Sequence, residues 1–429
     1  MRFSRRFMMA RLVSTLFSLL LLLSATPVLA ADRLDSGDTA WMLVSSALVL
    51  AMLPGLALFY GGMVRSKNVL STTMHTVAAM AIMGVQWVAI GYSLAFGGEG
   101  RFIGGLANAF LCGITPESLT GSIPTYVFIM FQGMFAVITP ALISGAIAER
   151  MKFSTYCVFI LLWGTLVYDP LCHWVWGDGG WLLELGALDF AGGTVVHLSS
   201  GISALVLALA LGRRIGYPQE RLVPHNLPMT LLGAGLLWFG WFGFNAGSAL
   251  SAGGSAALAF ATTQTAAAAG ALSWMLLEWL HAGKPSALGA ASGIVAGLVV
   301  ITPAAGFVTP GWAMLMGLTA GPVCYGGVML KHRLGYDDSL DAFGVHGLGG
   351  AWGAVATGIF ATVGATGLVS GNFHQFWVQL IGVVAAGGYA VVVTTLLVLV
   401  LKATMGLRVE KDDERMGLDQ VAHSETAYS

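Results

Sequence analysis

The chain has 429 residues, of which 56% are hydrophobic and only 10% are charged, and its formal net charge is −1. A soluble domain carries roughly 25% charged residues, which is what covering its surface requires. The composition therefore excludes an ordinary soluble protein and predicts that the main solvent is lipid. A net charge so close to zero also gives no general attraction to nucleic acid.

The first thirty residues have the pattern of a secretory signal peptide. Four arginines at positions 2, 5, 6 and 11 precede an apolar run from Leu12 to Leu23, and Val28-Leu29-Ala30 fits the small-x-small rule for cleavage. The alternative is an uncleaved first membrane helix, for which the run is short against the ~20 residues of a full crossing. We predict a signal peptide over 1–30 that is removed, which leaves the mature N-terminus outside.

Apolar blocks of helical length, separated by short polar loops, fill the rest of the chain. Transmembrane β-strands would be half as long and would alternate in polarity, so an all-α membrane protein is predicted. We expect eleven transmembrane helices, in a transport domain over 31–402, at about 40–61, 70–95, 124–148, 154–173, 190–211, 227–245, 254–280, 287–303, 310–331, 343–362 and 375–402.

Lysines and arginines give an independent test of this topology. If the first span starts outside, the inside loops and the tail hold fourteen basic residues, the outside holds Arg33 and Arg101, and four lie in the signal peptide. That asymmetry is the positive-inside rule. It predicts a cytoplasmic C-terminus and a polar cytoplasmic tail over 403–429.

Two similar runs place a histidine inside a span. Asp189 precedes His197 at the start of the fifth span, and Asp341 precedes His346 at the start of the tenth. A lone histidine is usually a structural residue, but ionisable groups in lipid are costly and typically functional. Because the runs lie five spans apart, we expect a five-plus-five inverted repeat, followed by one extra C-terminal helix, that brings both histidines near mid-membrane. Asp189 could either cap its helix or contact a cation directly, and Asp341 could likewise be a cap.

Aromatic residues gather at three places: 131–135 in the third span, 173–177 at the end of the fourth and 241–248 at the end of the sixth. Such residues are common in the aromatic belt of membrane proteins. They could equally bind a small cation through their ring faces, or close a pore. The pattern alone leaves both interpretations open.

Several long runs resemble the Amt/Mep/Rh ammonium transporter family, and within it the bacterial Amt branch. The resemblance covers about 38–428 and rests on the runs 189–197 and 343–347, Leu58-Phe-Tyr-Gly-Gly62, Pro224-His-Asn-Leu-Pro228, Trp241-Phe-Gly-Phe-Asn-Ala-Gly-Ser248 and Gly406-Leu-Arg-Val409. It implies a homotrimer with one pore through each subunit, and transport of ammonium or ammonia across the inner membrane.

The resemblance also assigns residues to roles. It implies an outer cation site at Trp176, Phe135 and Ser248, with Phe131 nearby and Asp189 fixing the backbone. It implies a gate of Phe135 and Phe244 and a pore lined by His197 and His346. The stretch between Trp176 and Asp189 is one residue longer than the family pattern, so Trp174 remains an alternative to Trp176.

The sequence bears on two other functions. An ammonium sensor that signals through a cytoplasmic partner is the alternative, although no output domain follows the last span. An enzyme is not expected, because the sequence has no catalytic triad, metal motif or nucleotide loop, and no cofactor is expected. The resemblance further implies that a PII-type signalling protein docks on the cytoplasmic face.

Overall fold

The computed structural model describes residues 33–220 and 222–428, so the predicted signal peptide lies outside the described part. Long helices make up most of it, because the backbone of an apolar segment can satisfy its own hydrogen bonds in this form. The elements of the first half are α2 (Ser36–Met63), η1 (Ser66–Asn68), α3 (Val69–Gln86), η2 (Trp87–Gly91), α4 (Tyr92–Phe96), η3 (Ala109–Leu111), β1 (Leu119–Thr120), β2 (Ile123–Pro124), α5 (Thr125–Ile147), α6 (Phe153–Trp163), η4 (Gly164–Tyr168), α7 (Asp169–Trp176), α8 (Trp181–Glu184), η5 (Gly193–Leu198) and α9 (Ser199–Leu211). Those of the second half are α10 (Leu227–Trp241), η6 (Phe242–Ala246), α11 (Gly254–Ala282), α12 (Ala287–Ile301), η7 (Thr302–Ala304), α13 (Pro310–Leu334), η8 (Phe343–Gly347), α14 (Leu348–Phe360), η9 (Leu368–Ser370), α15 (Phe373–Thr404), α16 (Lys411–Met416) and α17 (Leu418–His423).

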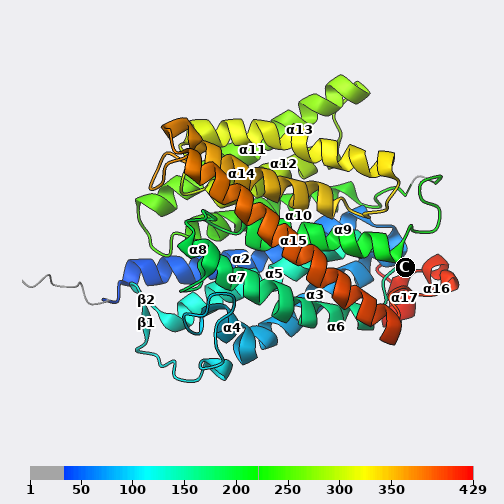
Figure 1. The fold of residues 1–429 in the computed structure, drawn as a ribbon. Helices are drawn as coiled ribbons and strands as arrows, with labels where there is room; N and C mark the ends of the chain where they lie inside the picture. The colour runs from blue at the N-terminus through cyan, green and yellow to red at the C-terminus, as the bar shows by residue number, and fades with distance from the viewer. Residues whose placement is uncertain (1–32, 221, 429) are drawn as a thin grey trace, which may run out of the picture.

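Each of the eleven predicted spans coincides with a helical segment of the structure. In the described residues, nine segments are long and apolar enough to cross a membrane by length and composition, and the two others are α11 and η8–α14. The all-α membrane fold is therefore confirmed, while the number of crossings stays a prediction. The helices run side by side across the molecule (Figure 1), with α8 and the β1–β2 hairpin at one end and α16 and α17 at the other.

Glycines bring some helices unusually close. A Cβ on Gly297 of α12 would lie 2.3 Å from the backbone oxygen of Ala266 on α11, and a Cβ on Gly293 would lie 2.8 Å from the oxygen of Gly270. Small residues permit such contacts between helix backbones in lipid. The glycines of α12 therefore serve the packing of α11 against α12, and we assign them no functional role.

The tail folds back onto the loops at its end of the bundle. Arg408 forms an ion pair with Glu414, and the backbone N–H of Leu418 donates to Asn68 Oδ1 at 2.8 Å. Asp419 accepts from the backbone N–H of Ser71 at 2.7 Å, and Lys67 donates to the carbonyl oxygen of Glu414. The tail is thus attached to the start of the second span through several specific bonds.

Buried charges connect the loops beneath the tail. Glu149 forms ion pairs with Arg65 and Arg214, and Arg214 also forms an ion pair with Asp337. Burial would raise the pKa of Glu149, but Arg214 and Arg65 reverse this, so that the pKa lies below its ordinary value of 4.5. The carboxylate therefore stays charged at neutral pH and ties together three loops from different parts of the chain.

Candidate functional site

A hollow near the α8 end of the bundle is lined by aromatic residues. This aromatic cavity has a volume of about 190 Å³ and is formed by Phe96, Phe128, Gln132, Phe135, Val175, Trp176, Leu183, Phe190, Ser248 and Leu250. The rings of Phe135 and Trp176 meet edge to face, with centroids 5.9 Å apart. The Ser248 hydroxyl donates to the carbonyl of Phe244 at 2.8 Å, which leaves its oxygen lone pairs able to accept.

Trp176, rather than Trp174, belongs to this cavity. The Trp176 indole N–H donates to the Asp189 carbonyl at 2.8 Å, which fixes the ring at the cavity wall. The Trp174 indole instead donates to the Phe102 carbonyl, and its ring packs on Tyr389 with centroids 4.7 Å apart. The structure thus separates two positions that the sequence left open.

Two phenylalanine rings close the bottom of the aromatic cavity. Phe135 and Phe244 stack with centroids 4.2 Å apart and an interplanar angle of 24°, and both are buried. Phe135 lines the aromatic cavity, whereas Phe244 lines the next cavity along. Phe131 lies against Phe135 at 5.1 Å between centroids, but it is not among the residues that line the aromatic cavity.

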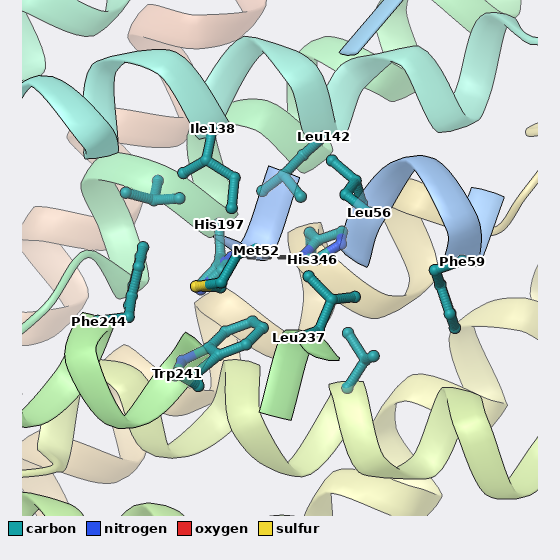
Figure 2. A pocket seen from close by; sticks show the side chains of 12 residues that line it. Met52, Leu56, Phe59, Ile138, Leu142, His197, Leu237, Trp241, Phe244 and His346 are labelled. Atoms are coloured by element: carbon teal, nitrogen blue, oxygen red, sulfur yellow. Dashed lines mark hydrogen bonds between the residues drawn. The ribbon is translucent and has the colours of Figure 1, made fainter. Parts of the chain in front are cut away.

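Behind this stack lies a narrow, almost entirely apolar space that holds the two histidines (Figure 2). This histidine cavity has a volume of only about 10 Å³, the scale of a single water molecule. Its wall consists of Met52, Leu56, Phe59, Ile138, Leu142, Val196, His197, Leu237, Trp241, Phe244, Val295 and His346. It is therefore a small space with few polar groups.

The two imidazoles face each other across this space. Their Nδ1 atoms lie 3.2 Å apart, and the rings are nearly parallel, at 17°. His197 also stacks on Trp241 with centroids 5.4 Å apart, and the Trp241 indole donates to Thr302 at 2.9 Å. The predicted meeting of His197 and His346 is thus present, and aromatic packing holds one ring in place.

Both oxygens of the Asp189 carboxylate accept hydrogen bonds from the first residues of the helix that carries His197. One oxygen accepts from the backbone N–H groups of Gly192 and Gly193 at 2.8 and 2.6 Å. The other accepts from the Thr194 N–H at 2.8 Å and from the Thr194 hydroxyl. Gly192 itself has φ 106°, a conformation that favours glycine. Asp189 is a helix cap, and it is not among the residues that line the aromatic cavity.

The counterpart of Asp189 is Asp338, and the expectation that placed Asp341 there is wrong. Asp338 accepts from the backbone N–H groups of Ala342 and Phe343 at 3.1 and 2.8 Å. Asp341 instead forms an ion pair with Lys331. Asp338 precedes His346 by eight residues, the same interval that separates Asp189 from His197. Both histidines lie in a π-helical turn, η5 or η8, that follows its capping aspartate.

A third hollow lies on the far side of the histidine cavity. This tail-side cavity has a volume of about 460 Å³ and is lined by Met63, Arg214, Tyr217, Pro218, Glu220, Leu222, Val223, Pro224, Leu288, Lys331, His332, Ser339, Leu340 and Asp341. Together the three hollows run from the aromatic end of the bundle to the tail end. Along this route the stacked phenylalanines separate the first two hollows, and the histidine cavity is the smallest of the three.

Three residues of this route were missed by sequence reasoning. Gln132 lines the aromatic cavity, and its buried Oε1 atom has no hydrogen-bond partner within the described residues. Trp241 forms the wall beside His197, and Asp338 caps the second histidine helix. The run Asp337-Asp338 three residues before Asp341 carried a signal for Asp338, since its interval to His346 equals that of the first run.

The fold is that of a multi-pass membrane protein, and three hollows lie between the helices of its described part. The sequence profile of the Ammonium Transporter Family matches residues 40–428. The chain is 51% identical to an ammonium transporter of Bacillus subtilis, over 92% of this chain and 99% of the relative, and 50% identical to one of Aquifex aeolicus, over 92% and 94%. The chain belongs to the ammonium transporter family.

Solved structures agree with this assignment. The crystal structure of Saccharomyces cerevisiae Mep2 has a TM-score of 0.83 and 40% identity and covers 89% of each chain. A structure titled Sensor Amt Protein has a TM-score of 0.85 and 31% identity, over 91% of this chain and 98% of that one. The family is one of transporters and not of enzymes, in agreement with the sequence-based expectation.

Proposed function

We propose that this protein carries ammonium nitrogen across the membrane by capturing the cation, removing its proton and passing neutral ammonia through the histidine cavity, which serves as a dry passage. One observation carries the proposal above the others. A pair of facing histidines lies in an apolar space of about 10 Å³, immediately behind two stacked phenylalanines.

Electrostatics favours a neutral species in such a passage. Moving a bare ion of ammonium size into a low-dielectric medium costs on the order of 20 kcal/mol. A desolvated cation–π contact returns only ~2 kcal/mol. Ammonium can release a proton and continue as ammonia, whereas a potassium ion has no proton to release. The electrostatic cost of a bare ion in the passage therefore excludes potassium, while ammonium can cross as ammonia.

The aromatic cavity is the proposed capture site. The Trp176 and Phe135 ring faces and the Ser248 hydroxyl would hold the cation, with Phe131 packed behind Phe135. Asp189 supports this site indirectly, because its carboxylate caps η5 and its carbonyl accepts the Trp176 indole N–H. Phe135 and Phe244 then form the gate, which a side-chain rotation would open.

The histidines are proposed to guide ammonia and to handle the proton. Each imidazole can donate and accept a hydrogen bond, so the pair can contact ammonia and exchange a proton. Two adjacent imidazolium ions would repel each other, so the pair holds no more than one extra proton. The proton either stays on the aromatic side or passes along His197 and His346.

An ammonium sensor remains the second candidate, favoured by the neighbour titled Sensor Amt Protein and by the docked tail. Reconstitution in liposomes separates the two functions. Uptake of labelled methylammonium by the purified chain alone, driven only by its gradient, is the result expected of a transporter. A folded, correctly inserted protein that gives no uptake above empty liposomes would favour the sensor.

Assembly, partners and orientation follow from the resemblance and remain proposals. We propose a homotrimer in the inner membrane, with the aromatic cavity outside and the tail in the cytoplasm, and a PII-type signalling protein that binds the cytoplasmic face. The charged tail and the tail-side cavity lie at one end of the bundle and offer polar surface to such a partner. Recovery of the partner by the full chain but not by a chain ending at residue 402 would support a contribution of the tail.

A further inference from the structure

A second buried polar group lies in the membrane interior, away from the three hollows. Asp169 is the first residue of α7 and is fully buried. It follows Phe153 by sixteen residues and precedes Trp176 by seven, so that about 24 Å and 10 Å of helix separate it from the two ends of its segment. The sequence carried the signal for this residue, since an acid inside an apolar span is costly.

The polar contact of Asp169 is with an uncharged side chain. Gln86, the last residue of α3, donates from Nε2 to Asp169 Oδ2 at 2.6 Å and to the Thr165 hydroxyl at 3.2 Å. Gly91 gives the amide its room, because a Cβ there would lie 2.7 Å from Gln86 Oε1. A π-helical turn follows Gln86 and another ends just before Asp169, a feature frequent at functional sites.

Charged partners are lacking around this carboxyl group. Within the described residues, no lysine, arginine or histidine nitrogen lies within 4.0 Å of it. His173 directs both ring nitrogens to the carbonyls of Ala95 and Gly100. The titratable groups beside it are Tyr168 and Cys172 on the same segment. On the helices that pack against this segment, Tyr92 lies on α4 and Tyr389 lies on α15, where its hydroxyl donates to the Leu166 carbonyl. A bare carboxylate here would be an uncompensated charge in lipid.

Two acceptors of this pair have no hydrogen-bond partner among residues 33–220 and 222–428. They are Asp169 Oδ1 and Gln86 Oε1, both buried, and each belongs to a side chain whose other polar atom is bonded to the partner. One proton on Asp169 supplies the donor that is missing. If the amide were turned the other way, two acceptors would meet at 2.6 Å, and the same proton would be needed.

We propose that Asp169 and Gln86 form a proton-binding site within the membrane, in which the Asp169 carboxyl group is protonated at neutral pH and hydrogen-bonded to the Gln86 amide. The ligand is a proton, and it remains bound while substrate crosses, because the pair lies outside the aromatic, histidine and tail-side cavities. This site is independent of the proposed function, so either can fail without the other.

Infrared spectroscopy of the protein in lipid at pH 7 tests the proposal. The Asp169→Asn variant, which keeps the size and supplies a permanent N–H donor, is expected to lose one carboxylic acid C=O band. Glu184→Gln, at an exposed position of α8, is the matched control and should lose only carboxylate intensity. Gln86→Leu should shift the acid band to higher frequency, because the carbonyl oxygen loses its donor. Isotope labelling of aspartate carboxyl groups identifies the band in the unaltered chain, without dependence on how any variant folds.

Two outcomes would overturn the proposal. One is an infrared spectrum in which Asp169→Asn lowers the ionised carboxylate intensity and leaves every carboxylic acid band in place. The other is a thermal transition that sodium or potassium raises in the unaltered chain but not in Asp169→Asn, since that would identify a bound metal cation. In liposomes, methylammonium uptake by Asp169→Asn should stay within twofold of the unaltered chain. A tenfold loss in a folded variant would mean that the proton is released during transport, against the proposal.

Discussion

The Nδ1 atoms of His197 and His346 lie 3.2 Å apart, so the two imidazoles present the same ring nitrogen to each other. Two lone pairs or two N–H groups cannot form this contact, and one Nδ1 must donate while the other accepts. In the neutral pair, one Nε2 is therefore an acceptor and the other a donor. The pair has a direction, and reversing it requires a proton to move.

The aromatic cavity predicts a change in apparent affinity. Trp176→Leu removes a ring face from the proposed cation site, and Ser248→Ala removes an acceptor. Each should raise the methylammonium concentration for half-maximal uptake by roughly five- to thirtyfold, equivalent to about 1–2 kcal/mol. Uptake at saturation should change little. Trp174→Leu is the matched control, because that ring packs on Tyr389, and an equal effect in both tryptophan variants would reject the assignment.

Replacing either capping aspartate, Asp189 or Asp338, should lower the stability of the protein without removing a residue that contacts the cation. Asp189→Asn turns one acceptor oxygen into a donor that faces the N–H groups at the start of η5. We expect a loss of about 1–3 kcal/mol, seen as a lower thermal transition in detergent. Asp338→Asn should do the same at η8. If Asp189→Asn weakened cation capture at unchanged stability, a direct role in binding would replace the capping role.

The ion pairs of Glu149 with Arg65 and Arg214 predict that the stability of the protein depends on pH. Because the pKa of Glu149 is below its ordinary 4.5 in the folded chain, the stabilisation is present above pH 4.5 and is lost as the pH falls through the folded pKa. Glu149→Gln should cost about 3 kcal/mol at pH 7, where it leaves Arg65 without its partner. The difference in thermal transition between the variant and the unaltered chain should narrow below pH 4.5. A difference that is the same at pH 4 and pH 7 would contradict this account.

Orientation can be tested with thiol labelling. Cys112 is an exposed free cysteine in the loop predicted to lie outside. Val223 is 60% exposed in the loop predicted to lie inside, and Val223→Cys provides the reporter there. In intact cells an impermeant reagent should label Cys112 at once and position 223 only after permeabilisation. Labelling of position 223 from outside would reverse the proposed topology.

Sequence patterns predicted the helices well, because lipid imposes length and polarity on each segment. The eleven predicted spans coincide with helical segments, and the two histidines meet as expected. The choice between Trp174 and Trp176 could not be made from spacing, because a residue's direction depends on how its helix is rotated against its neighbours. The structure resolves it through the indole hydrogen bonds to Phe102 and Asp189.

The roles of two acidic residues, Asp338 and Asp169, were not predicted from the sequence. Asp341 was predicted as the counterpart of Asp189 because it is the acid nearest to His346, yet the cap is Asp338. In the sequence, the one signal for Asp338 is its interval of eight residues to His346, which equals the interval from Asp189 to His197. Asp169 interrupts an apolar span, which marks it in the sequence as a costly residue, but the sequence does not show what it contacts. Its partner Gln86 lies on another helix, and no spacing rule connects residues that meet only through packing.

We propose that ammonia passes along the histidine pair while the apolar passage keeps potassium out, and paired recordings of current and internal pH on one liposome preparation test this most directly. His197→Asp places a carboxylate in the passage and is expected to admit potassium when ionised, whereas the unaltered chain excludes it. His197→Ala should reduce the ammonium-driven current more than the rise in internal pH that ammonia entry causes. If His197→Ala and His346→Ala left current, pH change and potassium exclusion untouched, the histidines would be packing residues and the proposed mechanism would be wrong.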